Sequence, residues 1–492
     1  MPPSAMAAKR ALDESAPQPV VANGHTSSHT RPKRARTITF DPTIPQPLIN
    51  ALYAESNVLK IWTVARKALG ATDPPVLYPE YTGKDKTYVY RALDFWTSGF
   101  FPGSLYLLLE RQIRYPTFYN RDSETPLPHR LLLQHLCQWW SANLHQNAAK
   151  RDTHDVGFMI VPWAIKAWEL HRDPQAYSSL VLAAHSLASR FDERVQSLRS
   201  WDICHTKRYS FTDPSKDFLV IIDNMLNLDL LFWVARETGD SSLYDVAVAH
   251  ARTTQRHHIR ADKSTCHVVN YHQNGTVKAK FTHQGYSDES CWSRGQAWGI
   301  LGFMQTYEWT REEGFLQTAR ELADYFLDHL PEDFVPYWDF DAPVDATCPR
   351  DTSAGMVACC GLVLLYKALR DSDERAARQY LDSAIRILDG TVSKFMMPSP
   401  TKFTVDLSGT TDLATFPDSE PAKQPGVLTL SHKHTTANGV NGSSGQCPET
   451  ILDAATVCNY EFASRRWADH GLVYADYYFL LLGNLLLELD LV

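Results

Sequence analysis

The chain has 492 residues and a hydrophobic content of 44%, which suffices for one large core or for two or three smaller domains. Its formal net charge of −8 argues against a general nucleic-acid-binding protein. We find no apolar stretch long and continuous enough to span a membrane, and the start of the chain lacks the apolar run of a secretory signal. The nine cysteines form no C-x-x-C pair, so we expect reduced thiols in a cytoplasmic protein without nucleic-acid or membrane partners.

The chain begins with a segment rich in Pro, Ser, Ala and charge, and residues 1–45 are expected to form a disordered tail. The basic cluster at 31–36 is either a nuclear-import signal or ordinary solvated tail. A second low-complexity stretch, at about 397–449, is predicted to be a long surface insertion. The remainder, 46–492, is predicted to be a single domain that carries this insertion.

Amphipathic helices recur along this domain. Four of them share a spacing of apolar and Ala positions, and each begins with an acidic residue suited to a helix N-cap: Asp173, Asp240, Glu313 and Asp373. Each follows a helix that is apolar on all sides, at 156–169, 221–236, 292–310 and 352–369. Helices that are apolar all round are buried, and helices with one apolar face lie outside. The alternation therefore predicts stacked helical hairpins.

The apolar helices can be counted from their expected starts, near Gly103, Asp155, Asp223, Trp292, Asp351 and Asp476. Six hairpins can close into an all-α toroid, the (α/α)6 barrel, and the alternative is an open solenoid. Irregular spacing and the insertion favour closure. In a closed barrel the inner helices point the same way, so their N-termini meet at one end.

Carboxylates gather at these expected helix starts. Asp223 lies among apolar residues and is expected one turn inside an apolar helix, where a carboxylate is costly unless it is paired or functional. The pair His154-Asp155 precedes Gly157-Phe158, and a helix N-cap alone would not require a histidine beside the aspartate. Asp351 and Asp476 are interpreted mainly as helix N-caps. Two carboxylates in a ring of aromatic residues indicate glycoside chemistry by proton transfer.

The segment 282–298 combines aromatic and polar side chains at the mouth of an apolar helix that is expected to start at about Ser290. Flat aromatic faces suit sugar rings, and a helix start offers free N–H groups and positive potential. We predict a ligand pocket here, and the alternative is a capped core helix with buried Trp. The candidate pocket residues are His283, Gln284, Trp292, Arg294 and Trp298.

A β-hairpin is predicted at 266–278, because the residues alternate in polarity and Asn274-Gly275 is a preferred tight turn. The hairpin precedes the pocket segment and is placed on the rim of the barrel. His267 within it is either a substrate contact or an ordinary structural histidine. The remaining histidine pairs lack a convincing set of metal ligands, so no metal and no cofactor are expected.

Several of these motifs resemble the unsaturated glucuronyl hydrolases, glycoside hydrolase family 88. The matching stretches are Trp96 with Gly99-Phe100, His154-Asp155 with Gly157-Phe158, 223–228, 283–298, 335–343 with 350–354, and 474–479. The resemblance runs in order over roughly 46–490, which is far more specific than any single motif. It implies an (α/α)6 barrel as a catalytic domain, in agreement with the helix count.

The resemblance implies an enzyme that acts after polysaccharide lyases. Lyases leave a 4-deoxy uronate with a C4=C5 double bond at the non-reducing end of an oligosaccharide. An Asp protonates C4, water adds at C5, and the hemiketal opens and releases the sugar partner. Carried over by motif, Asp223 is the acid and base of this hydration and Asp155 its essential partner. Trp96, Trp292 and Trp298 match stacking positions, and His154, His267, His283, Gln284 and Arg294 match pocket residues.

Three other functions remain as alternatives. Unsaturated rhamnogalacturonyl hydrolases share the barrel and the reaction but act on pectin fragments, although the sequence 294–298 resembles the glucuronyl group more closely. A non-catalytic sugar-binding barrel and an inverting glycosidase for saturated substrates are the others. The sugar partner, its sulfation and the oligomeric state are left open by the sequence.

Overall fold

The computed structural model describes residues 44–120, 127–398 and 447–492. Residues from Thr43 onward form one compact unit. The expected tail at 1–45, with its basic cluster, and the expected insertion at 397–449 lie almost entirely outside the described residues.

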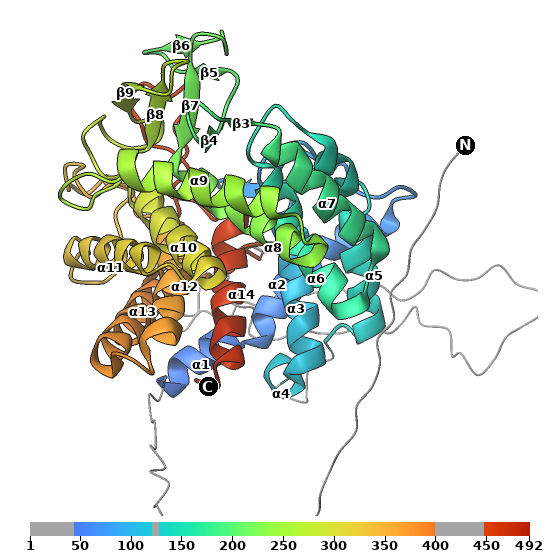
Figure 1. Cartoon of the computed structure of the whole chain (residues 1–492). Coiled ribbons are helices and arrows are strands. Elements are labelled where there is room, and N and C mark those ends of the chain that lie inside the picture. Colours follow the sequence, from blue (N-terminus) through green and yellow to red (C-terminus); the bar gives the residue numbers. More distant parts are fainter. Residues whose placement is uncertain (1–43, 121–126, 399–446) are drawn as a thin grey trace, which may run out of the picture. The chain divides into compact units, whose positions relative to one another are not determined.

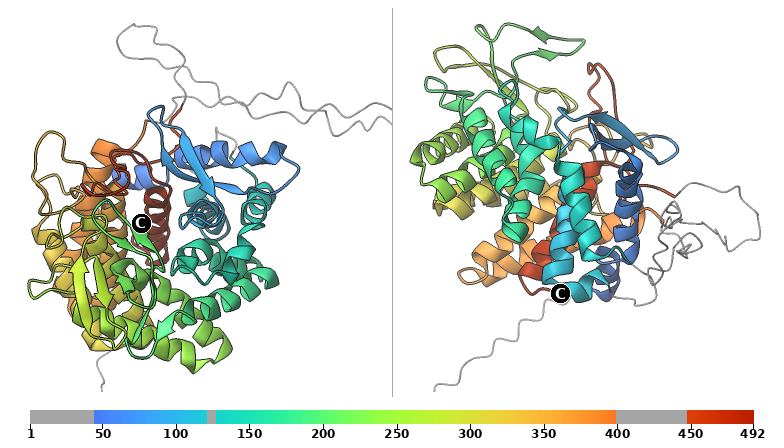
Figure 2. Two further views of the ribbon diagram at one scale, coloured as in Figure 1. Left: turned by 90° about the horizontal axis from the view of Figure 1, so that it is seen from above. Right: turned by 90° about the vertical axis from the view of Figure 1, so that its right-hand side faces the viewer.

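Six buried helices form a closed ring. They are α3 (Phe100–Arg114), α6 (Val156–His171), α8 (Leu228–Thr238), α10 (Ser293–Thr310), α12 (Thr352–Leu369) and α14 (Val473–Glu488). Each packs against the next, and α14 packs against α3, so the order closes on itself (Figures 1 and 2). The prediction of an (α/α)6 barrel is confirmed, and the predicted starts agree with these helices to within a few residues.

A second set of helices covers the outside of the ring. These are α5 (Arg130–Ser141), α7 (Pro174–Ala188), α9 (Ser241–His257), α11 (Glu313–Asp328) and α13 (Glu374–Phe395), with α1 (Gln46–Leu52) beside α14 and α2 (Glu55–Ala65) beside α3. In α13 the buried residues recur every three or four positions, from Ala377 to Thr391, so one face packs inward. Asp173, Asp240 and Asp373 cap their helices as predicted.

The inner helix α12 corrects one expectation. By length and composition it could cross a membrane, with a mean hydropathy of 1.6, although we expected no such stretch. Since 89% of it is buried inside the protein, it serves as a core helix of the ring.

The strands form small antiparallel sheets. Strand β1 (Leu77–Thr82) pairs with β2 (Tyr88–Ala92), β3 (Phe191–Asp192) with β4 (Ser197–Leu198), and β5 (Cys204–His205) with β6 (Ser210–Phe211). A three-stranded sheet joins β7 (Phe218–Ile221), β8 (Val268–Tyr271) and β9 (Val277–Phe281). The predicted hairpin is therefore confirmed as β8–β9. Its Gly275 has φ +84°, a conformation that favours glycine. Strands β3 to β9 lie toward one end of the helices (Figure 1), and β1–β2 lies apart from β7–β9 in the view from above (Figure 2).

The expected helix around Asp223 is wrong at its start. Residues Phe218–Ile221 form strand β7, and a 3-10 helix, η3 (Ile222–Asn227), leads from it into α8. Asp223 is thus the second residue of η3 instead of lying one turn inside a helix. The apolar run misled the prediction because a strand buried on both faces is as apolar as an inner helix.

Two further expectations about helix starts are settled. Helix α10 begins at Ser293, three residues after the expected start. Asp351 caps α12 as predicted, accepting the backbone N–H groups of Ser353 and Ala354. Asp476 does not cap α14, because it lies within the first turn and instead accepts N–H groups from a neighbouring loop.

Candidate active site

Asp155 stands at the start of α6 and is fixed by its neighbours. Its Oδ2 accepts the Thr153 hydroxyl at 2.7 Å, and its Oδ1 lies 3.1 Å from Nε2 of the fully buried His154. Burial by itself would raise the pKa of Asp155, but His154, the Thr153 hydroxyl and the positive charge of Arg190 outweigh it and lower the pKa below its usual value. Asp155 is therefore held as a carboxylate.

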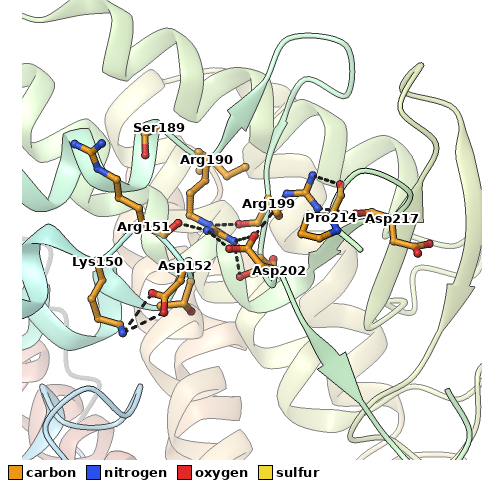
Figure 3. A network of polar contacts seen from close by, with 12 residues as sticks. Lys150, Arg151, Asp152, Ser189, Arg190, Arg199, Asp202, Pro214 and Asp217 are labelled. Carbon is orange, nitrogen blue, oxygen red and sulfur yellow. Dashed lines mark hydrogen bonds and ion pairs between the residues drawn. The ribbon is translucent and has the colours of Figure 1, made fainter. Parts of the chain in front are cut away.

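Arg190 joins the loop that contains Arg151 to the loop that contains Arg199 and Asp202 (Figure 3). Its guanidinium donates to the backbone carbonyl of Arg151 on one loop and to that of Arg199 on the other, at 2.8 Å for the latter. It also pairs with Asp202 at 3.0 Å. Because Arg190 is 7% exposed, this network is a rigid support more than a surface ion pair. It places the segment that carries His154 and Asp155.

The surroundings of Asp223 raise its pKa, as a general acid requires. Burial raises the pKa of Asp223 to about 6, and the Asp155 charge adds to this, although His154 and Arg294 act in the opposite direction. Its Oδ1 is buried and has no hydrogen-bond partner among the described residues. Because Oδ1 is enclosed and faces His267 while the side chain keeps 12% exposure, the accessible part of the carboxyl lies away from Oδ1. Two carboxyl groups with pKa values shifted in opposite directions are typical of an acid–base site.

His267 faces Asp223 as a neutral ring. Its Nδ1 accepts the backbone N–H of His283 at 3.1 Å, so the proton is assigned to Nε2, which lies 3.8 Å from Asp223 Oδ1. Burial, together with His283 and Arg294, lowers the pKa of His267 well below its usual value. The ring of Trp292 packs on it at 4.5 Å between centroids. His267 thus presents an N–H toward the carboxyl that is predicted to react.

Arg294 is buried at the start of α10, and its guanidinium contacts residues at the starts of α12 and α14. Its Nη1 pairs with Asp351 Oδ2 at 2.6 Å and donates to the Thr456 carbonyl, and its Nη2 donates to the Val457 carbonyl at 2.6 Å. The guanidinium lies over Trp292 at 4.6 Å and over Tyr474 at 5.4 Å. Nε is buried without a partner among the described residues. Arg294 therefore orders the pocket wall and adds positive potential near Asp223.

A cavity of about 390 Å³ reaches this cluster through His283, whose backbone N–H binds His267, and none of Asp155, Asp223, His267 and Arg294 is among its lining residues. Of the predicted substrate contacts, Trp96, His283 and Gln284 line it. Gln284 donates to the Val457 carbonyl at 2.8 Å, and His283 Nδ1 lies 2.9 Å from the Tyr209 hydroxyl. Burial lowers the pKa of His283 to about 4, so its ring is neutral. A cavity of this size, with aromatic walls and few polar groups, is typical of small-ligand sites.

The two predicted tryptophans of α10 lie deeper than the cavity. Trp292 is 2% exposed and packs between His267 and Arg294. Trp298 has no exposed surface and packs behind Phe158, at 5.5 Å between ring centroids. Phe158 in turn contacts Trp96 at 5.6 Å. Trp298 therefore supports the aromatic wall from behind.

Two site residues were missed by the sequence reasoning. Trp201 lines the cavity, and its ring lies 5.0 Å from His283 and 6.3 Å from His267. It sits in an irregular loop, where no periodicity marks it. Tyr474, quoted only within a helix start and a matching stretch, has a buried hydroxyl with no partner among the residues that the structure describes, and its ring lies 5.1 Å from that of Trp96. Among the described residues, no group of three or more His, Cys, Asp or Glu could hold a metal ion.

Comparison with known proteins extends this picture. An unsaturated glucuronyl hydrolase from Formosa agariphila is 36% identical over 298 residues, which are 60% of this chain and 67% of that protein. An unsaturated chondroitin disaccharide hydrolase from Streptococcus pyogenes serotype M1 is 31% identical over 317 residues, 63% of this chain and 73% of that protein. No protein-family model matches the chain.

Solved structures agree over most of the chain. The crystal structure of an unsaturated glucuronyl hydrolase specific for heparin is 26% identical and superposes with a TM-score of 0.67, covering 90% of this chain and 98% of that one. The order of the helices, the residues at the starts of the inner helices and the relatives at more than 30% identity all indicate the same family. The chain belongs to the unsaturated glucuronyl hydrolase family and is a glycoside hydrolase of that type.

Proposed function

We propose that this protein removes a 4,5-unsaturated uronate from the non-reducing end of lyase-generated oligosaccharides by hydrating the C4=C5 double bond. The observation that supports this most directly is Asp223, a buried carboxyl whose pKa is raised to about 6 beside the ionised Asp155. Direct displacement at an anomeric carbon would call for one acid and one nucleophile or base. Hydration of an enol ether requires one group that first gives a proton and then takes one back.

The proposed reaction uses Asp223 in both roles. The carboxyl donates its proton to C4, and the C4=C5 electron pair forms the new C–H bond. The positive charge that develops at C5 is shared with the ring oxygen. Asp223, now a carboxylate, accepts a proton from water as the water oxygen bonds to C5. The resulting hemiketal opens by cleavage of the C5–O5 bond to a ketone at C5 and a hemiacetal at C1. Collapse of this hemiacetal to an aldehyde breaks the bond from C1 to the sugar partner and releases it, and Asp223 is already protonated again.

The neighbours of Asp223 have distinct parts in this scheme. Asp155 stays ionised, and its charge favours the protonated form of Asp223 before the reaction and the developing positive charge during it. The Nε2 proton of His267 faces Asp223 and orients its carboxyl. Trp96 and Trp201 offer flat faces in the cavity for the sugar rings.

The relatives support a proposal about the class of substrate. One solved relative, 24% identical with a TM-score of 0.65, carries the sugar dGlcA-Glc-Rha-Glc, and a Streptococcus agalactiae relative, 22% identical with a TM-score of 0.61, carries dGlcA-GalNAc6S. Both sugars begin with an unsaturated glucuronate, whereas the following residue differs. Because other relatives are named for chondroitin disaccharides and for heparin, we propose glycosaminoglycan-derived disaccharides as the substrates of this chain.

The proposal is tested with a panel of lyase-generated disaccharides. Hydration removes the conjugated double bond, so its ultraviolet absorbance should disappear with glycosaminoglycan-derived members and much more slowly with pectin-derived ones. Faster loss with the pectin-derived members would favour an unsaturated rhamnogalacturonyl hydrolase. Unchanged absorbance across the panel, with cleavage of saturated glucuronides instead, would contradict hydration.

The pH profile of kcat/KM should have an alkaline limb near pH 6. The raised pKa of Asp223 means that its proton is present below about pH 6 and is lost as the pH rises through that value. Asp155 must be ionised, and its lowered pKa places the acid limb below the usual pKa of an aspartate. In Asp155→Asn the charge that helps to raise the Asp223 pKa is gone, so the alkaline limb should move to lower pH. An alkaline limb that stays in place in Asp155→Asn, measured at low ionic strength, would contradict this coupling.

A further inference from the structure

The chain segment that closes the cavity wall begins far from the catalytic groups. Residues 449–458, which we call the strap, run as irregular chain from shortly after 399–446 to the cavity, where Val457 and Cys458 form part of the lining. Eight of these ten residues are buried, although the strap contains no helix or strand. Buried irregular backbone must find its hydrogen bonds elsewhere.

The C-terminal half of the strap, which contains Thr456 and Val457, is bound by side chains of the site already described. Arg294 donates to the carbonyls of Thr456 and Val457, and Gln284 donates to the Val457 carbonyl. The Thr456 N–H lies 3.4 Å from Asp351 Oδ1. A shift of this half along the chain direction would break all these contacts and displace the cavity wall.

The N-terminal half of the strap, which contains Thr450, Ile451 and Leu452, is bound by two buried ionisable side chains. Lys60 on α2 is 4% exposed, and its ammonium donates to the Thr450 carbonyl at 2.8 Å and to the Met397 carbonyl at 3.1 Å. Asp476 on α14 has no exposed surface, and its two oxygens accept the N–H groups of Ile451 at 2.9 Å and of Leu452 at 3.0 Å. Three successive residues of the strap are therefore held by two charged side chains from different helices.

The chain on the other side of 399–446 is tied to the same place. The Met397 N–H donates to the Ile451 carbonyl at 2.8 Å, and the Asp453 N–H donates to the Phe395 carbonyl at 2.9 Å. The Lys60 ammonium thus joins the carbonyls of Met397 and Thr450, on the two sides of 399–446. Two apolar side chains would fill the same volume at lower desolvation cost, but they would leave two carbonyls and two N–H groups unpaired. The polar pair sets the register of the strap.

We propose that Lys60 and Asp476 are positioning residues of the active site, which fix the register of the strap so that the carbonyls of Thr456 and Val457 meet Arg294 and Gln284 and the cavity wall takes its shape. Neither side chain lines the cavity. Their effect on turnover passes through substrate binding, and the proton transfer by Asp223 is not altered.

The variants Lys60→Met and Asp476→Asn test this role. Lys60→Met removes the donor to both carbonyls at similar length, and Asp476→Asn keeps the shape but leaves one strap N–H without an acceptor. We expect amide exchange at 449–458 to rise about tenfold, KM to rise about tenfold and kcat to change by less than about threefold, because misplacement of binding groups acts on affinity. The alkaline limb of the pH profile should stay where it is in the unaltered protein.

Lys166→Met is the matched control. Lys166, like Lys60, has an ammonium held by two acceptors, here Glu110 and Glu169 on the inner helices, but no contact of Lys166 with the strap is seen among the described residues. It should leave KM and strap exchange unchanged. Should Lys60→Met fail to fold, Asp476→Asn alone decides.

Because the kinetic readout rests on the proposed function, amide exchange is measured in parallel. An unaltered protein that is inactive on every unsaturated disaccharide would refute the proposed function while the exchange data still report on the strap. Unchanged strap exchange in a folded variant, or a lower Tm with KM and exchange as in the control, would overturn the positioning role.

Discussion

Asp223→Asn should lower kcat by about 10²–10⁴-fold with little change in substrate affinity, because the amide has the shape of the acid but no proton to give. The raised pKa of Asp223, about 6, makes the neutral acid the main form below that pH, so an amide there removes chemistry without removing a charge. Turnover is followed by loss of the double-bond absorbance, and affinity by calorimetry with the same disaccharide. The variant protein should keep the Tm of the unaltered protein or exceed it.

Asp229→Asn is the matched control for this substitution. Asp229 lies six positions further on, in the first turn of α8, and its pKa is also raised by burial. Its carboxyl accepts Nε1 of Trp309 at 2.6 Å and takes no part in the cavity. It should therefore lose stability and keep turnover. Near-normal kcat in Asp223→Asn, or an equal loss in both variants, would contradict the assignment of Asp223 as the acid.

Arg294→Met should reduce the free energy of unfolding by about 3–5 kcal/mol, because it leaves Asp351 as an uncompensated buried carboxylate. Arg294 is 1% exposed and Asp351 is 0% exposed, so water cannot replace the lost partner. The Thr456 carbonyl loses the Arg294 donor at the same time, and the Val457 carbonyl keeps only the bond from Gln284. The change is measured by chemical denaturation, and turnover of the folded fraction should fall as well.

Arg350→Met is the comparison, since Arg350 also pairs with an aspartate, Asp333 at 2.9 Å, but both side chains reach the surface. Its loss should be on the order of 1 kcal/mol. The double variant Arg294→Met/Asp351→Asn should recover part of the stability that Arg294→Met loses, because the unpaired charge is removed. Equal losses for Arg294→Met and Arg350→Met would show that burial of the ion pair does not govern its contribution.

Sequence periodicity predicted the barrel well. Inner and outer helices bury different fractions of their surface, and the spacing of apolar residues along the sequence reflects this difference. Helix α12 is apolar on all sides and α13 on one side only, and both were recognised. Periodicity failed at β7, where four buried residues read equally well as strand or helix. That failure moved Asp223 from a helix interior to a 3-10 turn, although its site was still correctly placed at a helix mouth.

The sequence by itself determined the ring of helices, the family resemblance and the residue types gathered at the helix mouths, since these depend on local patterns and short motifs. Only the tertiary structure decided how those residues are used. The opposite pKa shifts of Asp155 and Asp223, the tautomer of His267 and the buried pairing of Arg294 with Asp351 depend on distances between segments far apart in the chain. Electrostatic and hydrogen-bond energies are set by those distances and by burial, which no spacing along one chain encodes.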